Sequence, residues 1–243
     1  MIRVCSQKAS MFRMSLQQFT SHYILGVPTA GIALIVGAQQ VEANAWQREE
    51  GTSFLSFSIQ STIDGPDYGP YASVYFEYGL SESLTFGIDA GRNLETNEGT
   101  STFFLQLPLP LELGSNLFAA ELGIGTADVS GDKHAAFRFG LSWGRPYQAR
   151  WVNGWLGIDA THAMYESGDH LTKVDATFGV AHTTGSLSLV QLQFAAPSYG
   201  TNTIGIAPSF ILALSDLAFV ELGGVYEIRS SVTSLKLGVW SNF

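Results

Sequence analysis

The chain has 243 residues and a formal charge of −9, with 46% hydrophobic and 14% charged residues. This length suits one or two ordinary domains. An acidic balance argues against nucleic acid as a partner, because phosphates are neutralised by a basic surface. Cys5 is the only cysteine, which excludes a disulfide framework and a cysteine-based metal site.

The first 45 residues resemble a targeting segment rather than part of a fold. Residues 1–22 carry three basic residues and no acid, residues 23–38 are apolar, and Ala43-Asn44-Ala45 follows a short polar stretch. This order is typical of a secretory signal peptide with an A-x-A cleavage site. We therefore expect a signal peptide at 1–45 and one β-barrel domain at 46–243. A retained N-terminal anchor is the alternative, although a bilayer span needs about 20 apolar residues. The true start methionine stays open.

Beyond Trp46 the apolar residues recur with period two, as in residues 72–78 and 174–180. A helix would scatter such a pattern around its axis, so the alternation predicts β-strands. No later apolar run is long enough for a membrane-spanning helix. We place strands at 52–61, 71–80, 84–93, 101–110, 116–126, 135–143, 151–161, 171–182, 186–195, 203–214, 217–228 and 232–243.

The predicted connections alternate between longer polar loops, such as 94–100, 127–134 and 162–170, and tight turns, such as 81–83 and 215–216. This asymmetry is typical of outer-membrane barrels, whose short turns are periplasmic. The sequence predicts an all-β, transmembrane, antiparallel up-and-down barrel of about 12 strands, with ten as the alternative. A soluble sandwich is less consistent with the few lysines beyond residue 45.

The last strand ends the chain on an aromatic residue and places four apolar residues on one face: Leu235, Leu237, Val239 and Phe243. It resembles the terminal strand of bacterial outer-membrane proteins, although Ser241 departs from that pattern. The resemblance implies an outer-membrane protein of a Gram-negative bacterium, with these four residues as an assembly signal for the barrel-assembly machinery. Outer-membrane lipid and lipopolysaccharide are then the expected surroundings, and no single named family is indicated.

In such a barrel the apolar face meets lipid and the polar face lines the lumen. Strand parity therefore directs nine charged residues inward, and hairpin symmetry pairs Glu121 with Arg138, Asp159 with Lys173, and Glu221 with Lys236. The other inward charges are Glu77, Asp89 and Asp175. Bulky aromatic residues share the inward parity: Tyr71, Tyr75, Phe104, Trp151, Trp155 and Trp240.

Two functions follow from this lumen. The first is a narrow porin-like channel or transporter for small solutes, and the second is a non-transporting barrel with a filled lumen that serves envelope structure or surface contact. An outer-membrane hydrolase is a distant third, because Asp159, Thr161 and His162 form the nearest approach to a catalytic group and no G-x-S-x-G or H-E-x-x-H motif is present. We expect no enzyme activity, cofactor or metal.

Overall fold

A computed structural model describes residues 45–111, 113–129, 131–149 and 152–243. The predicted signal peptide therefore lies outside the described residues, except for Ala45. The strands are β1 (Ser53–Asp64), β2 (Tyr71–Ser81), β3 (Leu84–Asn93), β4 (Gly99–Pro108), β5 (Leu117–Val129), β6 (Asp132–Ala149), β7 (Val152–Tyr165), β8 (His170–Ala181), β9 (Leu187–Pro197), β10 (Thr203–Ala213), β11 (Ala218–Glu227) and β12 (Val232–Asn242).

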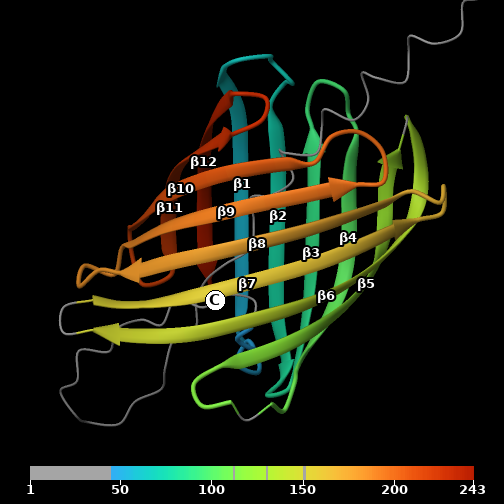
Figure 1. The fold of residues 1–243 in the computed structure, drawn as a ribbon. Helices are drawn as coiled ribbons and strands as arrows, with labels where there is room; N and C mark the ends of the chain where they lie inside the picture. Colours follow the sequence, from blue (N-terminus) through green and yellow to red (C-terminus); the bar gives the residue numbers. More distant parts are fainter. Residues whose placement is uncertain (1–44, 112, 130, 150–151) are drawn as a thin grey trace, which may run out of the picture.

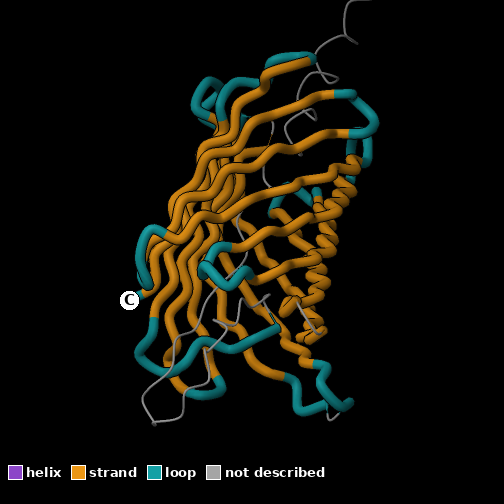
Figure 2. Tube along the Cα trace, turned by 90° about the vertical axis from the view of Figure 1, so that its left-hand side faces the viewer, coloured by secondary structure: helices purple, strands orange, loops and turns teal. Residues whose placement is uncertain are grey.

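Each strand pairs antiparallel with its neighbours in the chain, and β1 pairs with β12 to close the barrel. Figure 1 follows this up-and-down order around the barrel, and Figure 2 shows a wall built of strands and loops. Closure leaves no free sheet edge, so the backbone hydrogen bonds are satisfied within the wall. The predicted all-β antiparallel barrel is confirmed. The described residues form 12 strands, which is the larger of the two expected numbers.

The sequence predicts long loops at one end of the barrel and tight turns at the other, and this prediction is wrong. Strand β5 continues to Val129 and β6 begins at Asp132, so most of the predicted loop at 127–134 is strand and only two positions separate β5 from β6. The paired ends carry polar side chains, and Asp128 forms a 3.1 Å ion pair with Lys133 across the hairpin. Polar residues thus extend a strand at the rim. The 109–116 connection lies at the end where short turns were predicted, yet it has more residues than the connection between β5 and β6.

Each end of the barrel has its own set of connections. We call the end that carries Ser53 and Phe243 the terminal end, since these residues exchange backbone hydrogen bonds there. It also holds the connections after β2, β4, β6, β8 and β10, and the connections after the odd-numbered strands lie at the opposite end.

The outer face of the barrel is apolar and exposed, while the inner face is buried. On β5 the outward Leu122 and Ile124 are 58% and 66% exposed, whereas Glu121 and Gly123, which alternate with them, are buried. A continuous apolar exterior of this kind marks contact with a membrane in place of water. Among the described residues no helix is long and apolar enough to cross a membrane.

Candidate functional site

The half of the lumen near the terminal end is filled by apolar side chains. A buried cluster occupies it, formed by Phe54, Tyr75, Phe104, Trp155, Leu187, Leu189, Ile211, Phe219 and Trp240. The rings contact one another: Tyr75 stacks on Phe104 with centroids 5.8 Å apart, and Phe54 meets Trp240 edge-on at 6.0 Å. We call this set the aromatic cluster. It narrows the lumen, as expected from the aromatic residues that the sequence places on the inward face of the strands. Trp151, also predicted there, lies outside the described residues.

Glycine makes room for the largest of these side chains. Trp155 on β7 lies opposite Gly179 on β8, and a Cβ atom added at Gly179 would lie 2.1 Å from the indole ring. Gly87 gives the same space to the ring of Phe104 across the β3–β4 pair. The inner wall therefore alternates large and absent side chains, which lets the aromatic rings lie flat against the backbone.

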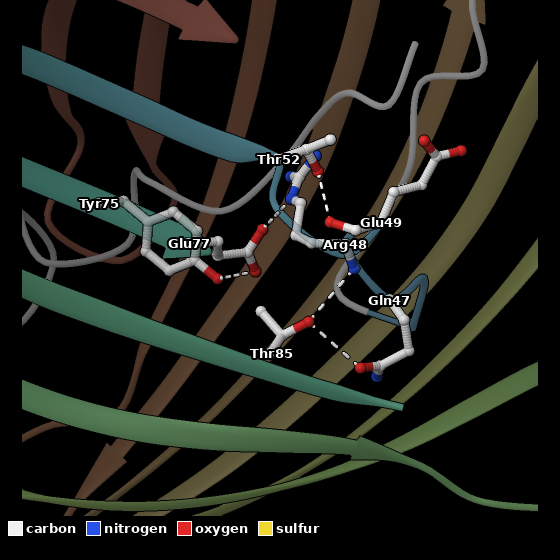
Figure 3. Close-up of polar contacts among 7 residues, drawn as sticks. All are labelled: Gln47, Arg48, Glu49, Thr52, Tyr75, Glu77 and Thr85. Carbon is white, nitrogen blue, oxygen red and sulfur yellow. Dashed lines mark hydrogen bonds and ion pairs between the residues drawn. The ribbon is translucent and has the colours of Figure 1, made fainter. Parts of the chain in front are cut away.

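The segment Ala45–Glu50, which precedes β1, turns back into the lumen at the terminal end (Figure 3). Gly51 adopts a left-handed conformation with φ of 81°, and Thr52 N donates to Glu49 O, which closes the turn. The ring of Trp46 packs against the aromatic cluster and occupies the space beside Gly144 on the inner face of β6. We call residues 45–50 the inserted segment, and it closes the half of the lumen that the aromatic cluster already narrows.

Arg48 fastens the inserted segment to the wall. Its side chain is 6% exposed, its Nε donates to Glu77 Oε2 at 2.5 Å, and its guanidinium lies 4.9 Å from the centroid of the Phe54 ring. Glu77 also accepts a 2.6 Å hydrogen bond from Tyr75 Oη, and Arg48 N donates to Thr85 Oγ1 at 3.2 Å. These partners offset the free-energy cost of burying the Glu77 carboxylate. Strand parity places Glu77 inward, but nothing in the sequence indicates Arg48 as its partner.

The opposite half of the lumen holds a cavity of about 50 Å³. Its wall is built by β2 to β8 and combines polar side chains with alanine and leucine side chains. The charged side chains that line it are Asp89, Asp159, Asp175, Arg138 and Lys173. The uncharged polar residues that line it are Tyr71, Ser73, Thr100, Thr102, Thr126, Thr161 and Tyr165. We call this cavity the polar chamber.

Arg138 crosses the lumen from β6 and joins two carboxylates. Its Nε donates to Glu121 on β5 and its Nη1 donates to Asp89 on β3, both at 2.6 Å. The guanidinium also lies 5.4 Å from the centroid of the Phe104 ring. Glu121 is diagonal to Arg138, because the structure pairs Glu121 with Gly140 and Arg138 with Gly123. The predicted direct opposition is therefore wrong by two residues, and a diagonal pair still lies within reach of long side chains.

The second predicted pair is also displaced by two residues. Asp159 on β7 lies opposite Asp175 on β8, and Lys173 lies opposite Thr161. Both aspartates are buried. Lys173 interacts electrostatically with Asp89 and Asp175. The midpoint of the hairpin differs from the predicted one by one residue, which shifts each partner by two and preserves the face of every side chain.

Glu221 and Lys236 form the third inward pair, beside the aromatic cluster. Lys236 Nζ lies 2.8 Å from Glu221 Oε1, and Trp240 Nε1 donates to Glu221 Oε2 at 3.1 Å. The register again makes the pair diagonal, since Glu221 lies opposite Gly238. Among the predicted inward charges, each base thus has an acid as an electrostatic partner.

The residues of the hydrolase hypothesis are not brought together. Asp159 and Thr161 line the polar chamber. The ring of His162 lies on the other face of β7, where its centroid is 5.2 Å from that of the outward Phe139. Thr161 and His162 are separated because adjacent residues of a strand point to opposite faces of the sheet. Among the described residues no three His, Cys, Asp or Glu side chains are grouped to hold a metal ion.

The four apolar residues of the terminal strand lie on the outer face. Leu235, Leu237, Val239 and Phe243 are all exposed, whereas Lys236, Gly238 and Trp240 between them are buried. The strand therefore presents an apolar stripe, interrupted at Ser241, to the surroundings of the barrel.

Comparison with known proteins identifies the fold but no sequence family. No family model matches the chain, and no curated protein is significantly similar to it. The KdgM porin superimposes with a TM-score of 0.54 at 8% identity, over 78% of this chain and 99% of the porin. An outer-membrane channel from Pseudomonas putida F1 gives 0.54 at 11% identity, over 80% and 96%. The KdgM porin in complex with disordered oligogalacturonate gives 0.51 at 9%, over 79% and 99%. The chain thus has the fold of bacterial outer-membrane β-barrels.

Proposed function

We propose that this protein is an outer-membrane channel for small hydrophilic solutes, open to solutes at the polar chamber and closed toward the terminal end by the inserted segment. The observation that carries the proposal is the polar chamber itself. A barrel that only anchors or scaffolds needs a packed interior, whereas this one keeps a cavity lined by charged and hydroxyl side chains. Such groups replace part of the water shell of a hydrophilic solute as it enters.

The comparisons support a channel but not the solute. One structure of the KdgM porin is a complex with disordered oligogalacturonate, whose sugar units carry carboxylates. The polar chamber here has three carboxylates against two cationic groups in its wall, and Arg138 is already paired with Asp89 and Glu121. An anionic sugar would therefore face net repulsion, and about 50 Å³ leaves room for only a few atoms.

For placement in the cell, we propose that residues 1–45 are removed as a signal peptide and that the terminal end faces the periplasm. The apolar stripe of Leu235, Leu237, Val239 and Phe243 on the outer face supports their role as the signal for the barrel-assembly machinery. The exposed apolar exterior supports a surrounding of outer-membrane lipid, with lipopolysaccharide in the outer leaflet.

A second candidate is a barrel with a filled lumen that does not transport. The aromatic cluster and the inserted segment favour it, because together they occupy the terminal half of the lumen. The two candidates differ in whether that half opens. Within the inserted segment, Arg48 forms an ion pair with Glu77 of the wall, so this contact is the one whose removal tests the closure.

Swelling of proteoliposomes that contain the purified protein distinguishes the two candidates. We expect swelling in small neutral solutes such as glycerol, and a sharp fall in rate for a disaccharide. Liposomes without protein and liposomes with an unrelated eight-strand barrel serve as controls. Rates equal to these controls for every solute would reject the channel and leave the filled barrel.

A further inference from the structure

Two aspartates face each other inside the polar chamber. Asp159 and Asp175 are directly opposite on β7 and β8, and they are 4% and 5% exposed. Like charges directly opposite in a sheet destabilise it, and burial increases the cost. Lys173 supplies one positive charge near the pair. The formal charges of these three groups therefore sum to one negative charge.

Polar atoms of both kinds are left without a hydrogen bond in this chamber. Asp175 Oδ1 is buried and accepts no hydrogen bond from any described residue, although Asp175 lines the cavity. Arg138 Nη2 is buried and likewise finds no acceptor among the described residues, while its Nε and Nη1 are bonded to Glu121 and Asp89. A buried polar atom without a partner costs about 1–3 kcal/mol. The wall of the chamber thus contains an acceptor and a donor that form no hydrogen bond with the described residues.

We propose that the polar chamber binds a small zwitterion of the amino-acid type, with its ammonium group between Asp159 and Asp175 and its carboxylate on Arg138 Nη2. This inference rests on the proposed channel function and names its solute class. An ammonium group donates three hydrogen bonds and offsets the excess negative charge of the aspartate pair. The carboxylate accepts from the remaining edge of the guanidinium.

The size and composition of the chamber favour this class over others. A volume of about 50 Å³ corresponds to about three or four water-sized positions, which suits a solute of a few heavy atoms. A simple anion finds two cationic groups in the wall, Arg138 and Lys173, but also meets three carboxylates there. A divalent cation lacks the third ligand, since no group of three His, Cys, Asp or Glu occurs in the described part of the chain.

Isothermal titration of the intact protein, purified from outer membranes in detergent, tests the proposal with glycine, ethylammonium and acetate as probes. We expect glycine to bind more tightly than ethylammonium by a factor of about ten, which corresponds to one charge-assisted hydrogen bond. Acetate should give no measurable heat of binding. Acetate binding as tight as that of glycine, or no binding of glycine at all, would overturn the assignment.

Two variants locate the site. Asp175→Asn keeps the shape of the side chain and removes its charge, so we expect glycine affinity to fall at least tenfold. Asp132→Asn, at the exposed start of β6, should leave the affinity within a factor of two. Folding of each variant is checked by the shift in gel mobility on heating that closed barrels show. Unchanged glycine affinity in folded Asp175→Asn would contradict the proposal.

The same preparation separates this inference from the proposed function. Swelling in glycerol without glycine binding would reject the zwitterion site and leave the channel. Glycine binding without swelling in any solute would reject the channel. The zwitterion would then be a ligand of a closed barrel, which contradicts its assignment as the transported solute.

Discussion

Trp155, Phe104 and Tyr75 near the terminal end are each 1% exposed and pack on one another, whereas the opposite half of the lumen keeps a cavity of about 50 Å³. The same wall of antiparallel strands encloses both. The terminal half is filled by rings lying over glycine, and the opposite half holds charges paired across the lumen. The difference teaches that strand number alone does not decide whether a barrel is open, because the inward residues of each half decide it separately.

The largest expected effect concerns the charges of the polar half. Changing Arg138 to Ala leaves Asp89 and Glu121 without their 2.6 Å partner and should lower the free energy of unfolding by about 3–5 kcal/mol, as expected when one side of a buried ion pair is removed. Urea titration of the protein in lipid bilayers measures this. Lys133→Ala is the matched control, because that lysine is 59% exposed in its pair with Asp128, and the expected loss is about 0–1 kcal/mol. Equal losses would mean that solvent screens both pairs alike.

The aromatic cluster should respond to lost volume instead of lost charge. Ile211 is fully buried in the cluster, whereas its neighbour Leu212 faces outward and is 43% exposed. Ile211→Ala should cost about 2–5 kcal/mol, since it leaves a cavity among packed side chains. Leu212→Ala on the same strand should cost less than the inward change, because lipid fills the space left by the side chain. The same titration measures both, and a larger cost for the outward change would invert the assignment of faces.

A smaller effect is expected where glycine makes room for an aromatic ring. Gly179→Ala places a methyl group 2.1 Å from the present position of the Trp155 ring, so the ring must move. Overpacking of this kind costs about 1–3 kcal/mol. Gly168→Ala, which meets no atom within 4 Å but has a positive φ, separates steric overlap from backbone strain. The fluorescence of the protein should change with Gly179→Ala and stay constant with Gly168→Ala; no change in either would indicate that the Trp155 ring has free space.

The faces of the strands could be predicted from the sequence, and their pairing could not. Alternation places Glu77, Glu121 and Asp175 inward regardless of where each hairpin turns. The register depends on the turn, and each predicted midpoint was one residue early, so Asp159 lies opposite Asp175 instead of Lys173. Errors of this kind come in steps of two, because a step of one would turn the apolar face away from lipid.

Two features lay beyond what periodicity can show. The ends of β5 and β6 carry polar residues on the outer face, as at the paired Asp128 and Lys133, so the apolar outward residues stop before the strands do. The inserted segment has no regular pattern, and its contacts link Arg48 to Glu77 across 29 positions of the chain. A basic residue a few positions before the first strand was the only signal, and it indicates no particular partner.

Single-channel recording of the purified protein in a planar bilayer, beside the Arg48→Ala variant, tests the central claim most directly. The ion pair of Arg48 with Glu77 at 2.5 Å holds the inserted segment in the lumen, so its loss should release the segment from the wall. We expect rare, brief openings of the wild-type protein and openings of the same or larger conductance that occupy at least ten times more of the recording in the variant. Current that is absent from both proteins would contradict the account, because the terminal half would then stay closed with or without the inserted segment.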